Sequence, residues 1–247
     1  MQEFTTAARH LGRRVLLIYF LSVSALSITH QCAAQEVETP GADRERGSIA
    51  APSPWLEVIA PLQRRIDLKL YGFYIGELDA PSAQVDVPVR AAKFLTITPS
   101  YLYYSIPASG LDELANLPGA FADSYDEHQF RIDGTVAFAM HKFGISARNM
   151  YVRRFRPAPA DDSNRYRARI GIAHPVAVKG RIWQPFASYE AYYDWGNGGW
   201  NKDRVWTGVT LPVQKHVSFQ PSYLWERSDG VKTINYALFG VIVNTKK

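Results

Sequence analysis

Residues 185–211, "PFASYEAYYDWGNGGWNKDRVWTGVTL", contain a long extended segment in which polar and apolar side chains alternate. One side of the alternation is polar and the other is small or aromatic: Ser188, Glu190 and Asp194 against Ala187, Tyr189, Ala191, Tyr193 and Trp195. Successive side chains of a β-strand point to opposite faces, so this pattern predicts a strand. The apolar face packs either on the core of a soluble protein or on lipid around a membrane barrel.

The same alternation recurs along the chain, with turn signals between the extended segments. The predicted strands are 53–60, 64–77, 84–91, 94–106, 128–140, 144–155, 164–176, 181–195, 202–212, 216–227 and 231–244. Many exceed the five or six residues of an average globular strand and suit the roughly 9–11 residues of a tilted membrane strand. The faces of 144–155 and 231–244 cannot be assigned, because both alternate poorly.

The connections alternate in length. Those at 61–65, 141–144, 177–181 and 212–216 are short, and those at 107–127, 156–164 and 196–203 are long. In an antiparallel meander, every second connection emerges at the same end. Long loops at one end and short turns at the other are typical of outer-membrane barrels.

The N-terminus reads as a secretory signal peptide. Arg9, Arg13 and Arg14 precede the 14 apolar residues 15–28, and Cys32 and Ala34 stand at −3 and −1 of a cleavage site. That apolar stretch is too short to span a membrane. We therefore predict cleavage after Ala34, then a flexible lead-in over residues 35–52, which are polar and highly charged.

Composition narrows the class of protein further. The only cysteine lies in the signal, so the mature chain has no disulfide and must be held by packing or by a closed hydrogen-bond ladder. Removing the signal removes three basic residues and one acidic residue and leaves a formal net charge of +3. This small excess argues against nucleic-acid binding. No later segment has 18 consecutive apolar residues, although aromatic residues make up 13% of the chain.

The polar faces carry charges of both signs, as expected for a barrel lumen in which they can pair. The predicted lumen-facing residues are Asp67, Lys69, Arg131, Asp133, Arg165, Arg167, Arg169, Glu190, Arg204 and Glu226. The apolar faces carry aromatic side chains at the loop end, as in the girdle that lies at a membrane interface. The predicted girdle consists of Tyr74, Tyr103, Tyr193, Trp195, Tyr223 and Trp225.

The sequence therefore predicts an all-β protein, a single antiparallel transmembrane β-barrel formed by residues 53–247 and located in the outer membrane. Eleven segments are recognised, but bacterial single-chain barrels favour even numbers, so 10 or 12 strands are expected. Either 53–60 lies outside the closed sheet or a short strand has been missed.

Beyond the alternation, residues 53–244 resemble the bacterial outer-membrane barrels grouped as domain of unknown function 2490. The likeness lies in Trp55 of a first strand, "NRYRARIGI", "PFASYEAYYD", "NKDRVWTGVTL" and "PSYLWERSD". The resemblance implies an outer-membrane barrel and no established activity. Its partners would be membrane lipid and the barrel-assembly machinery. The chain departs from the usual pattern by ending in "VIVNTKK" rather than in an aromatic residue.

Two groups of residues could carry catalysis. His216 and Ser218 share one face of a strand, a spacing similar to that of lipid A deacylases, in which histidine activates serine. Ser218, however, falls on the polar face at the turn end. Asp126, Glu127 and His128 lie beside the longest loop, where barrel proteases activate water; calcium binding or simple solvation is the alternative. No histidine pair has zinc-ligand spacing, and we expect no metal or cofactor.

The expected function is therefore that of a non-enzymatic structural or narrow-pore barrel whose charged lumen is largely plugged. The alternative is a lipid-active outer-membrane enzyme, such as an acyl hydrolase that uses His216 and Ser218.

Overall fold

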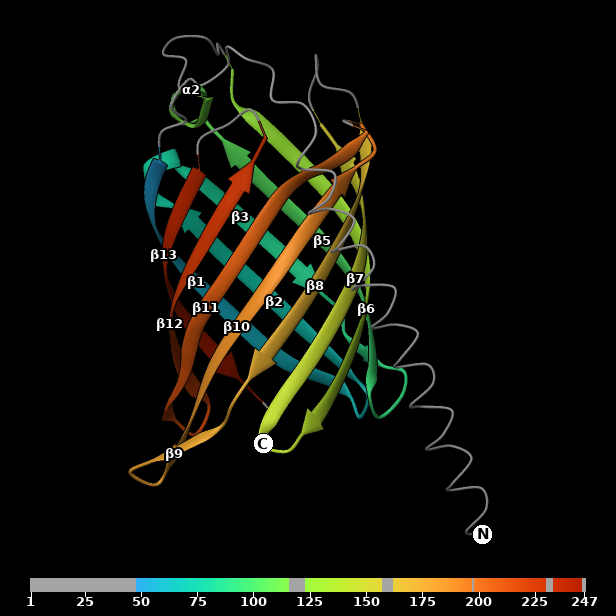
Figure 1. The fold of residues 1–247 in the computed structure, drawn as a ribbon, viewed down its shortest axis with the longest axis vertical. Helices are drawn as coiled ribbons and strands as arrows, with labels where there is room; N and C mark the ends of the chain where they lie inside the picture. The colour runs from blue at the N-terminus through green and yellow to red at the C-terminus, as the bar shows by residue number, and fades with distance from the viewer. Residues whose placement is uncertain (1–47, 116–122, 157–161, 197, 230–232, 246–247) are drawn as a thin grey trace. The chain divides into compact units, whose positions relative to one another are not determined.

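The computed structural model describes residues 48–115, 123–156, 162–196, 198–229 and 233–245 (Figure 1). The predicted signal peptide (1–34) and the lead-in up to residue 47 lie outside the described residues. Strand β1 begins at Ser48, five residues before the start predicted for the barrel.

The described residues are mainly β-strands. The elements are β1 (Ser48–Gln63), β2 (Ile66–Ile75), the 3-10 helix η1 (Gly76–Leu78), β3 (Ala80–Asp86), β4 (Val89–Arg90), β5 (Leu95–Ile106), α2 (Ala108–Ala115), β6 (Tyr125–Met140), β7 (Phe143–Phe155), β8 (Ser163–Ala173), β9 (Val176–Val178), β10 (Arg181–Asp194), β11 (Gly199–Gln214), β12 (Val217–Ser228) and β13 (Thr233–Asn244).

Two of these strands are interrupted rather than separate. β3 and β4 both pair with β2 and β5, and Pro88 lies in the gap between them. β8 and β9 both pair with β10, and Pro175 lies in their gap. Proline has no N–H to donate to a ladder, which explains both interruptions.

The sheet closes into a barrel, because β1 pairs with β2 on one side and with β13 on the other. With β3–β4 and β8–β9 each counted once, the ring within the described residues has eleven strands, not the 10 or 12 predicted. Successive strands of a meander reverse direction, so an odd number makes the first and last strands parallel. β1 and β13 do pair in parallel, from Ser48 opposite Thr233 to Ile59 opposite Asn244, and segment 53–60 therefore belongs to the ring.

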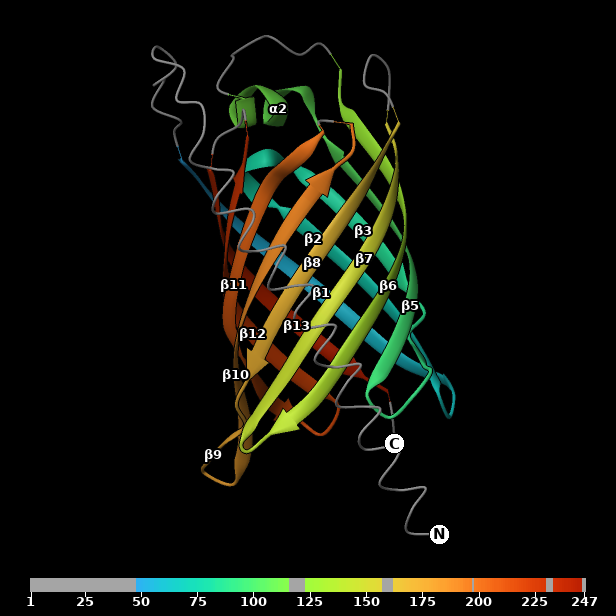
Figure 2. The same cartoon turned by 45° about the vertical axis from the view of Figure 1, so that its right-hand side comes forward.

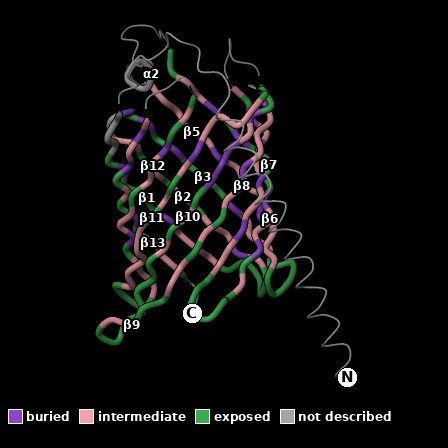
Figure 3. Tube along the Cα trace, in the orientation of Figure 1, coloured by how far each residue is buried: buried purple, intermediate pink, exposed green. Residues whose placement is uncertain are grey.

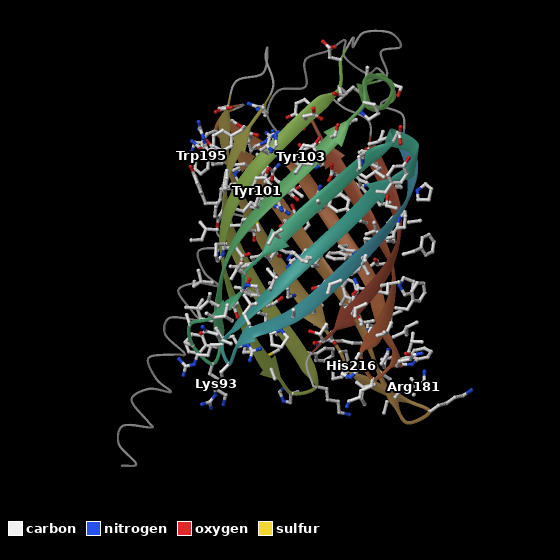
Figure 4. The ribbon with its side chains drawn as sticks, turned by 180° about the vertical axis from the view of Figure 1, so that it is seen from behind. Lys93, Tyr101, Tyr103, Arg181, Trp195 and His216 are labelled. Atoms are coloured by element: carbon white, nitrogen blue, oxygen red, sulfur yellow. The ribbon has the colours of Figure 1, made fainter. Side chains whose placement is uncertain are left out.

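The two ends of the barrel differ (Figure 2). α2 lies at one end, which we call the loop end, and the β9 segment lies at the other, which we call the turn end. The short turns after β1, β6 and β11 consist of residues 64–65, 141–142 and 215–216. Figure 4 shows Tyr103 and Trp195 toward the loop end and Lys93, Arg181 and His216 toward the turn end.

Burial is inverted relative to a soluble protein. Exposed and buried residues alternate along the strands (Figure 3), and the exposed ones include large apolar side chains such as Phe130, Ile132, Ile170 and Phe239. Charged side chains such as Glu127, Arg154 and Glu190 are buried inside the barrel. Among the described residues, no helix has the length and apolarity needed to cross a membrane.

Candidate functional site

The barrel interior contains a cavity of about 750 Å³. Its lining includes eight of the ten predicted lumen residues: Lys69, Arg131, Arg165, Arg167, Arg169, Glu190, Arg204 and Glu226. The lining runs from Leu111 of α2 and Asp229 at the loop end to Glu57 and Gln220 near the middle of the strands. The cavity therefore extends from the loop end to the level of Lys69 on β2 and Gln220 on β12.

Arg154 of β7 binds two carboxylates at the loop end of the interior. Its guanidinium donates to both oxygens of Glu127 on β6, at 2.7 and 2.6 Å, and to Asp194 on β10 at 2.7 Å. Asp194 also accepts a hydrogen bond from Arg165 of β8 at 2.8 Å. Glu127 and Asp194 are almost fully inaccessible to solvent. This chain of charges joins four strands and satisfies carboxylates that would be costly to bury alone.

A second group surrounds Glu190 of β10, closer to the middle of the strands. Arg167 of β8 donates to one oxygen at 2.8 Å, and Arg148 of β7 forms an ion pair with the other. The hydroxyl of Tyr192 donates to Glu190 at 2.8 Å. Arg148 therefore reaches past β8 to a carboxylate two strands away, which keeps its side chain flat against the wall.

Tyr192 lies among four cations. The charged groups of Arg165, Arg167, Lys202 and Arg204 stand 5.6, 4.6, 5.8 and 5.2 Å from the centre of its ring. Cations at this distance are attracted by the electron density of an aromatic face. Lys202 and Arg204 of β11 also bind Glu226 of β12. The ring of Tyr192 therefore links three ion-pair groups, which together extend across β6, β7, β8, β10, β11 and β12.

The charges on β2, β3 and the neighbouring strands form smaller groups. Lys69 binds Glu57 at 3.0 Å. Arg131 projects from β6 and, among the described residues, donates only to neutral amide oxygens, those of Gln129 at 2.6 Å and Gln84 at 3.1 Å. Arg169 makes no ion pair with any carboxylate of the described residues. Both arginines are partly exposed to the cavity.

The two remaining predicted lumen residues, Asp67 and Asp133, are absent from the cavity lining. Both are buried and lie on the turn-end side of the cavity, where Asp67 binds Arg90 at 3.1 Å and Asp133 accepts a hydrogen bond from Thr135 at 3.0 Å. Gln220 is buried at the same end of the lining and binds Thr210. Packed side chains therefore occupy the interior below the cavity.

An apolar cluster covers part of the loop end. Leu78 of η1, Ala80, Ile234 and Tyr236 form its buried centre. Helix α2 packs on it closely, since a Cβ at Gly110 would lie 2.3 Å from the carbonyl oxygen of Leu78. Only glycine allows this approach, which places Leu111 of α2 over the cavity.

The predicted girdle residues lie on the outward sides of their strands, toward the loop end. Tyr74, Trp195 and Tyr223 are exposed, and Tyr103, Tyr193 and Trp225 are partly exposed. Tyr151, Tyr166 and Trp200, which the prediction did not include, join the same surface through ring contacts with Tyr193 and Trp195. Several of these hydroxyls bind polar groups, for example Tyr151 to Asn164 at 2.6 Å.

The candidate catalytic groups lie apart from the cavity. Nδ1 of His216 is 2.9 Å from the carbonyl oxygen of Asn244 at the turn end, so this nitrogen donates to the backbone. Of the group beside the longest loop, Glu127 points inward to Arg154. Asp126 and His128 contact the outward tyrosines Tyr103 and Tyr101 instead. These three side chains therefore do not converge on one point.

Sequence reasoning missed Tyr192, Arg148 and Arg154. Tyr192 lies on the polar face of "SYEAYYD", two residues after Glu190 and two before Asp194. Its place in the alternation could therefore have predicted that it faces the lumen. Strand β7 gave no such signal, because Met150 and Val152 share the inward face with the two arginines.

Comparisons with known proteins place the chain in a wider context. The family described as "Protein of unknown function (DUF2490)" matches residues 62–236. None of the curated proteins matches the sequence. Among solved structures, LpxR from Salmonella typhimurium is similar, with a TM-score of 0.44 and 10% sequence identity, over 73% of this chain and 84% of that chain.

Proposed function

The chain belongs to the DUF2490 family of proteins of unknown function, and we propose that it is a non-enzymatic outer-membrane β-barrel whose lumen is closed to ions. The observation that carries this proposal is the blind cavity. Its lining ends at residues such as Glu57 and Gln220, and the buried side chains of Asp67 and Asp133 lie beyond it toward the turn end. Eleven strands lie between the eight whose interior side chains can fill and the roughly 16 or more of open porins, so side chains can still close part of the lumen.

The ion-pair network supports the same proposal. Arg148, Arg167 and Glu190 hold one another at hydrogen-bond distance, so their side chains cannot swing aside without breaking a buried charge pair. A permeating ion would have to displace these contacts. We therefore expect a barrier that is maintained by electrostatics as well as by packing.

The barrier can be tested by planar-bilayer recording of the double variant Arg167→Ala, Glu190→Ala. The two substitutions remove Arg167 together with Glu190, which also leaves Arg148 without its carboxylate. Both changes open space in the lumen, so the conductance should rise above that of the unmodified protein. The matched control is Arg227→Ala, Asp203→Ala, which removes an ion pair of 2.9 Å whose arginine is exposed. An unchanged conductance in the first variant would place the barrier elsewhere and contradict this assignment.

The proposed location follows from the exposed apolar outer surface, which is suited to lipid. Long loops would face the outside of the cell and short turns the periplasm. We expect cleavage after Ala34 and fractionation of the mature protein with outer membranes. Mass spectrometry that finds an intact Met1, or a soluble periplasmic pool, would contradict this proposal.

The non-enzymatic role has a direct test against the alternative of an acyl hydrolase. Purified protein incubated with lipid A should release no fatty acid. Release that is lost in Ser218→Ala would favour the enzyme and overturn the proposal.

A further inference from the structure

The cavity has two walls of different chemistry. Strands β6, β7, β8 and β11 contribute basic side chains, among them Arg131, Arg148, Arg165, Arg167, Arg169 and Arg204. On the other side, β2, β5, β12 and β13 contribute apolar side chains that are partly exposed: Phe73, Ile75, Ile106, Leu224 and Leu238. A cavity that is apolar on one side and cationic on the other is suited to a molecule with an apolar part and an anionic part.

The interior carries more positive than negative charge. The lining includes ten arginines and lysines and five aspartates and glutamates. With the buried Asp67, Glu127, Asp133 and Asp194 counted as well, the cations still exceed the carboxylates by one. Two lining arginines have no carboxylate partner among the described residues. Arg131 donates to side-chain amides, and Arg169 makes no ion pair. Cations in a partly dehydrated interior are stabilised by an anion, so a ligand could supply what the described residues do not.

Further polar groups of the lining have no partner. Among the described residues, nothing accepts a hydrogen bond from Nε1 of Trp55 or of Trp206, and Oγ of Ser82 is also unpartnered. Ser82 is 8% exposed, and all three residues line the cavity. Buried polar atoms without partners are rare in native proteins, and an indole N–H can only donate.

We propose that the cavity binds an amphipathic anion, with a carboxylate or phosphate head at Arg131 and Arg169 and an alkyl chain along the apolar wall. The volume of about 750 Å³ falls within the range of ligand sites. The inference rests on the proposed closed lumen, since a through-pore would let such a molecule pass rather than hold it.

Calorimetric titration of the barrel in phosphatidylcholine nanodiscs tests the proposal, with empty nanodiscs as the blank. Dodecanoate or dodecyl phosphate should bind at least tenfold more tightly than dodecanol, whose chain has the same length and no charge. Acetate and inorganic phosphate should give no measurable binding. The preferred head group distinguishes a fatty acid from a phosphate-bearing lipid as the source of the ligand.

Variants locate the site. Arg131→Gln with Arg169→Gln should weaken binding of the preferred anion at least tenfold, whereas Arg131→Lys with Arg169→Lys should retain most of it. The matched control is Lys93→Gln with Lys142→Gln, which removes two exposed charges outside the cavity and should bind normally. Leu238→Ala should weaken binding, whereas its outward neighbour Phe239→Ala should not.

Equal binding of dodecanol and the anions, or full binding by the double glutamine variant, would overturn the binding site. An open-pore current in planar bilayers would instead overturn the closed lumen. The two failures are therefore distinguishable.

Discussion

Trp55 of β1 stands opposite Gly240 of β13 in the parallel pair that closes the barrel, and its indole ring lies over the glycine. A Cβ at position 240 would lie 2.0 Å from Cε2 of Trp55. Because Trp55 also lines the cavity, the contact is on the lumen side. Because Gly240 has no side chain, the indole of Trp55 can lie against the backbone where β1 and β13 meet, which we call the seam.

Gly240→Ala should therefore destabilise the barrel, by about 1–3 kcal/mol, because the indole or the seam must move to make room. Equilibrium unfolding in lipid vesicles measures the change. Gly72→Ala is the control, since a Cβ there meets nothing within 4 Å. Equal stability of the two variants would show that the seam is looser than the structure indicates.

Neighbouring arginines on β7 give a second test. Arg154→Ala leaves the buried Glu127 and Asp194 without their shared partner and should cost about 3–5 kcal/mol. Arg153→Ala removes a solvent-exposed pair with Asp162 and should cost less than about 1 kcal/mol. The same unfolding titration compares the two. A similar cost at both positions would contradict the assignment of Arg154 to the interior network.

The orientation of the strands gives a third prediction. Ile170 is exposed on the outside of β8, and Arg in its place should cost about 2–4 kcal/mol if the position lies near the bilayer midplane. Ser188 of β10 lines the cavity, so Ser188→Arg should cost less, because water that enters the cavity can solvate the charge. A greater cost at Ser188 would mean that the two faces have been exchanged.

The alternation in the sequence predicted much of this fold. In segments such as 181–195 and 164–172, the period-two pattern predicts which side chains face outward and which face inward, because lipid and lumen impose opposite chemistry on successive residues. The long and short connections also predicted which ends of the strands lie together.

The sequence pattern did not predict the number of strands or the individual side-chain contacts. Even parity is a preference rather than a geometric requirement, and the parallel closure is revealed by the register of β1 against β13 in the structure. Arg167 binds Glu190, another predicted lumen residue, whereas Arg165 binds Asp194, which the predicted lumen residues did not include. Such pairings depend on strand tilt and on which side chain reaches past a neighbour, as Arg148 does, and no local pattern encodes them.

The central claim is that the lumen does not conduct, and planar-bilayer recording of the unmodified mature protein tests it most directly. The blind cavity and its buried ion pairs predict insertion without a steady ionic current across a range of voltages and salt concentrations. Insertion must be verified independently, for example by protease protection of the inserted barrel. A stable open-channel current from the inserted, unmodified protein would contradict the account.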